Sequence, residues 1–103
     1  MKELLNKKKF DLPIDRAAVS ADWQARGFSC DLFVDPPGQC WEGFVHTTDE
    51  LVIVVEGRLE MEVDGEVAVM EPGDEVFIPA RAVHSVRNIH SGTSRWLSGY
   101  GRS

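Results

Sequence analysis

The sequence predicts a single all-β domain, a sandwich or barrel, preceded by a short N-terminal segment that is either helical or irregular. From Phe28 onward, about eight short runs of strand-forming residues alternate with turn signals at the spacing typical of such folds. Two of these runs are joined by Asp64-Gly65, a dipeptide that favours the type I′ turn of a β-hairpin. In the run before this turn, Leu59, Met61 and Val63 alternate with charged residues, as in a strand with one buried face.

The N-terminal segment contains one helix candidate. Ser20 is a possible N-cap, residues 21–26 form the helix body, and Gly27 follows as the C′ residue. A turn is the alternative, because Ala17, Val19, Ala21 and Trp23 also alternate along the chain.

The strand segments are bounded by residues that break regular structure. Asp-Pro-Pro-Gly at residues 35–38 ends the first run, and Pro72-Gly73-Asp74 separates two later runs. The expected strand segments are residues 28–34, 39–46, 50–55, 58–63, 66–70, 76–78, 83–89 and 95–100.

Length and composition indicate one globular domain over residues 1–103. With 103 residues, 43% of them hydrophobic, the chain can form only a modest core, so we expect it to pair as a homodimer. The longest uninterrupted apolar run, Leu51 to Val55, is too short to cross a membrane. The opening residues MKELLNKKKF lack the apolar core of a secretory signal, so we expect a cytoplasmic protein.

Charge and cysteine content exclude two further classes. The net charge is −6, and Arg58 is the only basic residue between positions 41 and 80, so binding of nucleic acid is not expected. The two cysteines, Cys30 and Cys40, are too few for a disulfide framework, and we expect both to be reduced and partly buried.

Three polar residues within the strand-rich region suggest a metal site. His46, Glu50 and His84 supply two imidazole nitrogens and one carboxylate, a combination that suits one divalent Fe, Mn, Ni or Zn ion. Ca(II) and Mg(II) are less suited, because they prefer ligands that are all oxygen.

The spacing of two motifs resembles that of the cupin family. Residues 38–57 follow the first cupin motif, G(X)5HXH(X)3–4E(X)6G, and residues 73–88 follow the second, G(X)5PXG(X)2H(X)3N. The positions that match are Gly38, His46, Glu50, Gly57, Gly73, Pro79, His84 and Asn88. The motifs span about half of the chain, and the resemblance implies a jelly-roll β-barrel, a fold that hosts many unrelated chemistries.

Two positions depart from the cupin pattern. Phe44 occupies the place of the first histidine, and Arg81 the place of the third glycine. The resemblance therefore carries over only His46, Glu50 and His84 of the usual four ligands. One interpretation is a two-histidine, one-carboxylate site with an additional open coordination position. The other is a site that has lost its metal and keeps its histidines as hydrogen-bonded interior groups.

Several neighbours are candidates for further roles. Glu42 shares strand parity with Phe44 and His46, so it is a candidate fourth ligand or general base, although a glutamate at a strand end is commonly solvated. Cys40 shares strand parity with the same residues. Arg81 can bind a carboxylate of the substrate, unless its turn leaves the side chain in solvent. Phe44, Cys40 and Arg81 are therefore the candidate substrate-binding residues.

Two functions remain from the sequence. The first is a metal-dependent enzyme of oxygenase or isomerase type that acts on a small polar organic molecule inside the barrel. The second is a non-catalytic barrel that binds or senses a small ligand, with a structural metal or none. We expect the aromatic residues Trp41, Phe77, Trp96 and Tyr100 to belong to the core or to a dimer interface.

Overall fold

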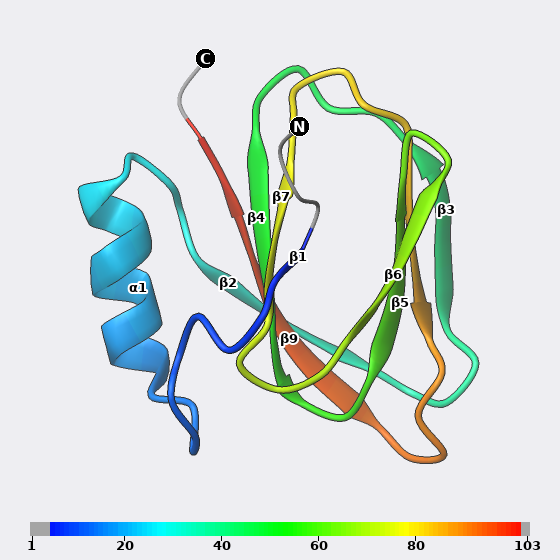
Figure 1. Cartoon of the computed structure of the whole chain (residues 1–103), viewed down its shortest axis with the longest axis horizontal. Helices are drawn as coiled ribbons and strands as arrows, with labels where there is room; N and C mark the ends of the chain where they lie inside the picture. Colours follow the sequence, from blue (N-terminus) through cyan, green and yellow to red (C-terminus); the bar gives the residue numbers. More distant parts are fainter. Residues whose placement is uncertain (1–4, 102–103) are drawn as a thin grey trace.

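The computed structural model describes residues 5–101, and residues 1–4 and 102–103 lie outside the described part. The prediction that residues 1–10 are not a secretory signal therefore falls partly outside it. Most of the described chain forms short strands, with one helix near its start (Figure 1). In chain order the elements are β1 (Leu5–Asn6), α1 (Arg16–Ala25), β2 (Asp31–Asp35), β3 (Cys40–Phe44), β4 (Glu50–Glu56), β5 (Leu59–Val63), β6 (Glu66–Met70), β7 (Glu75–Ile78), β8 (His84–Asn88) and β9 (Ser94–Tyr100).

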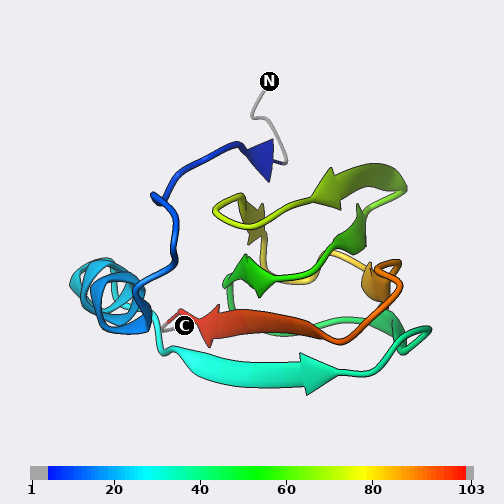
Figure 2. The same ribbon diagram turned by 90° about the horizontal axis from the view of Figure 1, so that it is seen from below.

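The strands form two antiparallel sheets that face each other (Figure 2). The five-stranded sheet has the order β1-β7-β4-β9-β2, and the four-stranded sheet has the order β3-β8-β5-β6. Among the described strands, only β5 and β6 are neighbours both in sequence and within a sheet, so nearly every other connection crosses from one sheet to the other. The predicted all-β jelly-roll fold is confirmed.

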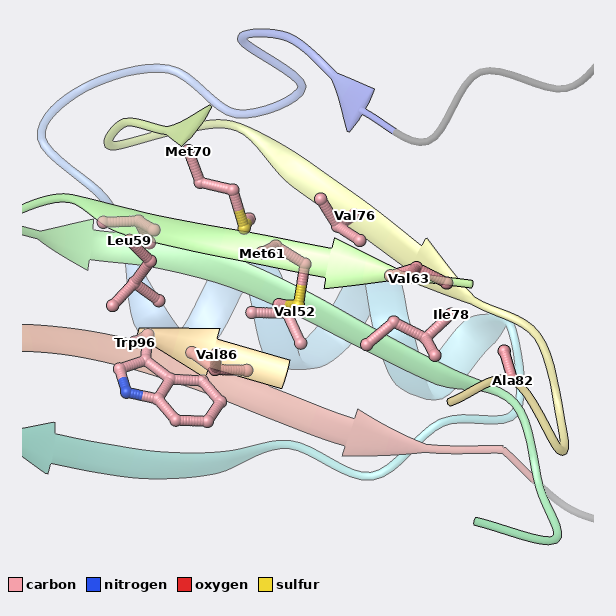
Figure 3. Close-up of a cluster of buried hydrophobic side chains, with 11 residues drawn as sticks. Val52, Leu59, Met61, Val63, Met70, Val76, Ile78, Ala82, Val86 and Trp96 are labelled. Atoms are coloured by element: carbon pink, nitrogen blue, oxygen red, sulfur yellow. The ribbon is translucent and has the colours of Figure 1, made fainter. Parts of the chain in front are cut away.

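The main core lies between the two sheets (Figure 3). Residues 50–54 of β4 are buried on both faces, because Val52 and Val54 point into this core while Leu51 and Ile53 point to the opposite side. A strand covered on both faces is apolar along its whole length, which explains the run Leu51 to Val55. The buried members of the core are Val52, Val54, Leu59, Met61, Val63, Met70, Val76, Ile78, Ala82, Val86 and Trp96.

The β5–β6 hairpin forms as predicted. Asp64 and Gly65 have φ angles of 48° and 85°, so both central residues occupy the left-handed region that a type I′ turn requires. Leu59, Met61 and Val63 are buried, and the residues between them are partly exposed.

The N-terminal segment contains a true helix, but its start was predicted wrongly. The N-cap is Asp15, not Ser20, and the Asp15 carboxylate accepts hydrogen bonds from the backbone of Ala17 and Ala18 at 3.0 and 3.3 Å. Asp15 is an equally strong capping residue that stands five positions earlier, so the helix gains more than one turn. The predicted C′ position is confirmed, since Gly27 has a φ of 87°.

Helix α1 packs on the outer face of the five-stranded sheet. Val19 and Trp23 are four residues apart, so they lie on the same side of the helix, where they contact Leu51, Ile53 and Leu97. The Trp23 indole also donates a hydrogen bond of 2.8 Å to the buried Glu75 carboxylate of β7.

A partly buried ion pair completes the attachment of the helix. Arg26 donates hydrogen bonds to both oxygens of Glu75, at 3.2 and 2.7 Å, and Glu75 is only 4% exposed. A bidentate guanidinium supplies the partners that a buried carboxylate needs.

No helix of residues 5–101 has the length and apolarity needed to span a membrane. The homodimer stays a prediction, which light scattering of the purified protein checks.

Candidate metal centre

The three predicted ligand residues meet at one end of the barrel. Glu50 is the first residue of β4, His84 is the first residue of β8, and His46 lies in the connection between β3 and β4. His84 Nε2 is 3.3 Å from Glu50 Oε1, and His46 Nε2 is 3.6 Å from the same oxygen. One ligand atom from each residue lies within 4.8 Å of the others, so the predicted cluster is present.

The Glu50 carboxylate is buried and only half satisfied. Its Oε2 accepts a hydrogen bond from the Ser98 hydroxyl, whereas its Oε1 has no hydrogen-bond partner and is the only such buried side-chain atom among the described residues. A buried oxygen without a partner is costly, and more so when it carries charge. The donor set fits a divalent ion: two imidazoles face this one free oxygen, and at ligand distances of about 2.0–2.2 Å such atoms lie roughly 3 Å apart.

The imidazoles are held with Nε2 toward Glu50. His84 Nδ1 lies 3.1 Å from the backbone oxygen of Ala82, which favours the tautomer with the proton on Nδ1. A backbone contact of this kind commonly orients histidines that bind a metal through the other nitrogen. His46 Nε2 lies 3.4 Å from the Tyr100 hydroxyl, and Tyr100 stands opposite Glu50 in the β4–β9 pairing.

The same carboxylate shifts the proton affinity of its neighbours. Burial lowers the pKa of His84, but hydrogen bonding to Glu50 and to the Ala82 carbonyl, together with the Glu50 charge, outweighs burial and leaves this pKa raised. When His84 is protonated, its Nε2 can donate to the otherwise unpartnered Oε1. Burial, and then the Glu50 charge, raise the pKa of Tyr100, which stays a neutral phenol near pH 7.

A cavity of about 160 Å³ opens beside this cluster. It lies between the strands β2 and β9 of one sheet and β3 and β8 of the other. The lining residues are Phe33, Trp41, Phe44, His46, Glu50, His84, Val86, Trp96, Ser98 and Tyr100. Phe44 lines the cavity, and its role in substrate binding stays a prediction. Its ring centre is 6.3 Å from that of His46 and 6.4 Å from that of His84.

A β-bulge in β3 overturns the predicted orientation of Cys40 and Glu42. Trp41 pairs with Val86 and Phe44 pairs with His84, so β3 carries one extra residue between these pairs. Gly43, with a φ of 69°, lies in this bulge, and its N–H donates to the Ser85 hydroxyl. The extra residue reverses the alternation, which puts Trp41 on the same inner face as Phe44.

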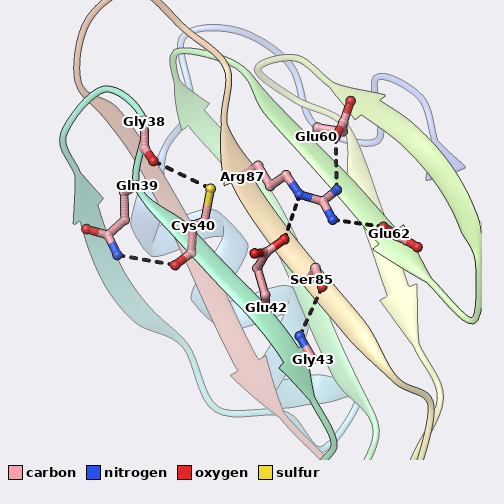
Figure 4. Close-up of polar contacts among 9 residues, drawn as sticks. All are labelled: Gly38, Gln39, Cys40, Glu42, Gly43, Glu60, Glu62, Ser85 and Arg87. Atoms are coloured by element: carbon pink, nitrogen blue, oxygen red, sulfur yellow. Dashed lines mark hydrogen bonds and ion pairs between the residues drawn. The ribbon is translucent and has the colours of Figure 1, made fainter.

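Cys40 and Glu42 consequently lie on the outer face of the sheet (Figure 4). Cys40 is exposed and stands opposite Arg87, while Glu42 forms an ion pair with Arg87 Nε at 3.1 Å. Glu60 and Glu62 bind the same guanidinium from β5. The predicted inward placement of Cys40 as a substrate contact and of Glu42 as a ligand or general base is wrong, and Cys40 is not partly buried.

Arg81 does not line the cavity either. Its φ of 69° explains why the cupin pattern has glycine at this position, since only a few other residues enter that region. The side chain is exposed, while its backbone N–H donates a 2.7 Å hydrogen bond to the carbonyl of His46. Arg81 thus supports, through its backbone, the loop that carries His46.

Sequence reasoning missed several residues of the cavity. Trp41 and Tyr100 were expected in the core or at a dimer interface, but they line the cavity. Trp96 is a buried member of the core, as predicted, and also lines the cavity, and Phe77 packs against the cluster beneath the helix. The alternation of Trp96, Ser98 and Tyr100 along β9 was a usable signal. For Trp41 no such signal existed, because the bulge reverses its side of the strand.

Comparison with known proteins identifies the family. A family model described as a Cupin domain (Cupin_2) matches residues 31–100. The chain belongs to the cupin family. No curated protein matches this cupin. Its ligand cluster and its jelly-roll fold agree with that membership, and motif positions 44 and 81 are where its sequence departs from the common pattern.

Solved structures of similar fold include three bacterial proteins. The Cupin_2 domain of an XRE family transcriptional regulator from Enterobacter cloacae is 27% identical, with a TM-score of 0.68 over 79% of this cupin and 88% of that chain. A protein from Thermus thermophilus is 25% identical, with a TM-score of 0.65 over 89% of this cupin and 100% of that chain. A cupin 2 domain-containing protein from Halorhodospira halophila is 25% identical, with a TM-score of 0.69 over 81% of this cupin and 58% of that chain.

Proposed function

We propose that this cupin is a metal-dependent enzyme of oxygenase type that acts on a small organic molecule in the cavity beside the metal. The observation that carries the metal-binding part is the position of Glu50 Oε1, buried without a hydrogen-bond partner and facing two imidazole nitrogens. His46, Glu50 and His84 would hold the ion. An ion with two nitrogens and one oxygen from the protein keeps positions open for substrate and dioxygen.

The cavity favours oxygenase chemistry over isomerase chemistry. An isomerase that moves a proton between carbon atoms needs a general base beside its substrate. Among the described residues that line the cavity, the only carboxylate and imidazoles are the three proposed ligands. The only hydroxyls of this lining are those of Ser98 and Tyr100, which orient Glu50 and His46. Glu42, the predicted base, lies outside.

A non-catalytic role in sensing a small ligand is the second candidate. The 27% identical Enterobacter cloacae domain belongs to a transcriptional regulator, and the missing base removes one feature that favoured turnover. In that role His46, Glu50 and His84 would hold a structural metal, and the cavity would bind a ligand without changing it.

Elemental analysis of the untagged protein, followed by anaerobic reconstitution with Fe(II), Mn(II), Ni(II) or Zn(II), tests the metal site. We expect about one equivalent of metal in the wild type and none in His84→Ala. His90→Ala is the matched control, because His90 is exposed and outside the cluster. Stoichiometric metal in His84→Ala would refute the ligand assignment.

Oxygen consumption then separates the two functions. The iron-loaded protein, mixed with a panel of small organic molecules, should consume oxygen in the presence of at least one of them if it is an oxygenase. Stoichiometric metal and ligand binding without oxygen consumption would favour the sensing role.

A further inference from the structure

We propose that the cavity takes a ligand with a single flat apolar ring, whose oxygen substituents face the metal. This ligand class deepens the proposed function, and only the placement of its oxygen substituents rests on the proposed metal. The placement of the ring depends on aromatic side chains that need no metal.

Four aromatic residues, Phe33, Trp41, Phe44 and Trp96, form what we call the aromatic wall of the cavity. The rings of Phe33 and Trp96 stack with centres 4.6 Å apart and planes inclined by 18°. Trp41 and Phe44 face them from the other sheet and have ring centres 6.1 Å apart. Because ring faces and edges attract other flat rings, a wall of this kind suits an aromatic group.

The aromatic wall offers no hydrogen-bond donor to a ligand. The indole N–H groups of Trp41 and Trp96 both donate to Asp35 Oδ2, at 3.0 Å each. Asp35 is 3% exposed, so this carboxylate is itself shielded behind the indoles. The two indoles are therefore held in place with their polar atoms occupied, and a ligand meets only their carbon surface.

Polar groups gather at the end of the cavity away from the two indoles, where Phe44 pairs with His84 and Tyr100 pairs with Glu50. His46, Glu50, His84, Ser98 and Tyr100 are all at the metal end. Among the described lining residues there is no lysine or arginine, so only the metal itself would bind a negatively charged oxygen of the ligand. A free cation is disfavoured, because a divalent ion would repel it. An apolar ring with oxygen on one side matches both ends.

The size of the cavity fits one ring. A cavity of about 150 Å³ lined by apolar side chains is known to bind benzene, and this one measures about 160 Å³. Trp41 and Phe44 remain 37% and 40% exposed, which leaves a route from solvent to the aromatic wall.

The three tryptophans provide a direct test. Trp41 and Trp96 line the cavity, while Trp23 belongs to helix α1, packs on the outer face of the five-stranded sheet and donates its N–H to Glu75. We would record ¹H–¹⁵N spectra of zinc-loaded protein, since zinc is redox-inert, while adding catechol. The indole signals of Trp41 and Trp96 should shift and that of Trp23 should stay. A catechol titration that moves no cavity indole would overturn the inference.

Comparator probes and a matched pair of variants sharpen the test. Calorimetry should show catechol binding at least about tenfold tighter than glycolate or tetramethylammonium, a difference of about 1.4 kcal/mol. Trp41→Ala should weaken catechol at least about tenfold and leave glycolate unchanged, whereas Trp41→Phe, which keeps a ring but not the N–H, should stay within about threefold of wild type. Equal or tighter binding of glycolate or tetramethylammonium, or equal losses in both variants, would contradict the proposed ring site.

Metal-free protein distinguishes failure of this inference from failure of the proposed function. Phenol should shift the cavity indoles of the metal-free protein, and Trp41→Ala should abolish that response. If no metal binds but phenol binding depends on Trp41, the metal proposal fails and the ring site stands. If metal binds and neither phenol nor catechol reaches the aromatic wall, the ring site fails and the metal proposal stands.

Discussion

Replacing Glu50 by glutamine should remove the metal and at the same time stabilise the metal-free protein. Glu50 Oε1 is buried with no hydrogen-bond partner, and such a group costs about 1–3 kcal/mol, more when charged. Glutamine has the same shape. Its amide oxygen can accept from Ser98, and its amide nitrogen can donate to the imidazole nitrogens that face Oε1. We therefore expect metal-free Glu50→Gln to gain about 1 kcal/mol, which is roughly 4–8 °C in Tm for a domain of this size.

The response to metal should go in the opposite direction. A ligand that binds only the folded protein stabilises it by about 2.7 kcal/mol at a hundredfold excess over its Kd. Wild type should show this rise, and Glu50→Gln should show none. The assay is thermal melting with chelator or with Zn(II), at a pH above the ordinary histidine value of about 6.5. Glu66→Gln, on an exposed residue, is the control and should match wild type in both conditions.

Two results would refute this reasoning. A metal-dependent rise in the Tm of Glu50→Gln would mean that Glu50 is not a ligand. A metal-free variant that melts well below wild type would mean that the carboxylate has partners in solution that satisfy Oε1.

Four further outcomes are expected. Phe44→His should tighten metal binding by at least about tenfold, because it restores an imidazole beside the two histidine rings; unchanged affinity in a zinc titration would mean that position 44 does not face the ion. Because the pKa of His84 is raised in the folded metal-free protein, protonated His84 stabilises the fold at pH values below the unfolded-state pKa of about 6.5. This stabilisation is lost as the pH rises through the pKa of the folded state. Since metal must displace that proton, zinc affinity should fall as the pH drops through the same range, and a pH-independent affinity would argue against His84. Arg26→Met should lower the free energy of unfolding, measured with denaturant, by about 2 kcal/mol, because the Glu75 carboxylate stays buried without its partner. This figure is discounted because the Arg26 side chain is 37% exposed. Cys40, which is exposed, should react with a thiol reagent before Cys30, whose pKa burial raises; a Cys40→Ser variant that keeps the fast phase would reverse this assignment.

The sequence by itself was sufficient for the strand pattern from Phe28 onward and for the candidate ligand residues, but not for β1, which is only two residues long. Turns such as Asp64-Gly65 act through the backbone preferences of the residues themselves, so they are readable without any tertiary contact. The spacing of His46, Glu50 and His84 was readable in the same way, because the motif positions place these residues at strand starts and in one connecting loop. The helix start was misjudged, since Asp15 and Ser20 are both good caps and only packing of Val19 and Trp23 selects between them.

Only the tertiary structure decided which residues face the cavity. Strand alternation predicts sides correctly as long as the pairing is regular, and one extra residue in β3 exchanged Glu42 for Trp41 on the inner face. The aromatic wall likewise depends on Asp35, which joins two indoles that stand far apart in the sequence. The missing partner of Glu50 Oε1, on which the metal site is argued, is also a property of packing, because no local pattern records which atoms are left without a hydrogen bond.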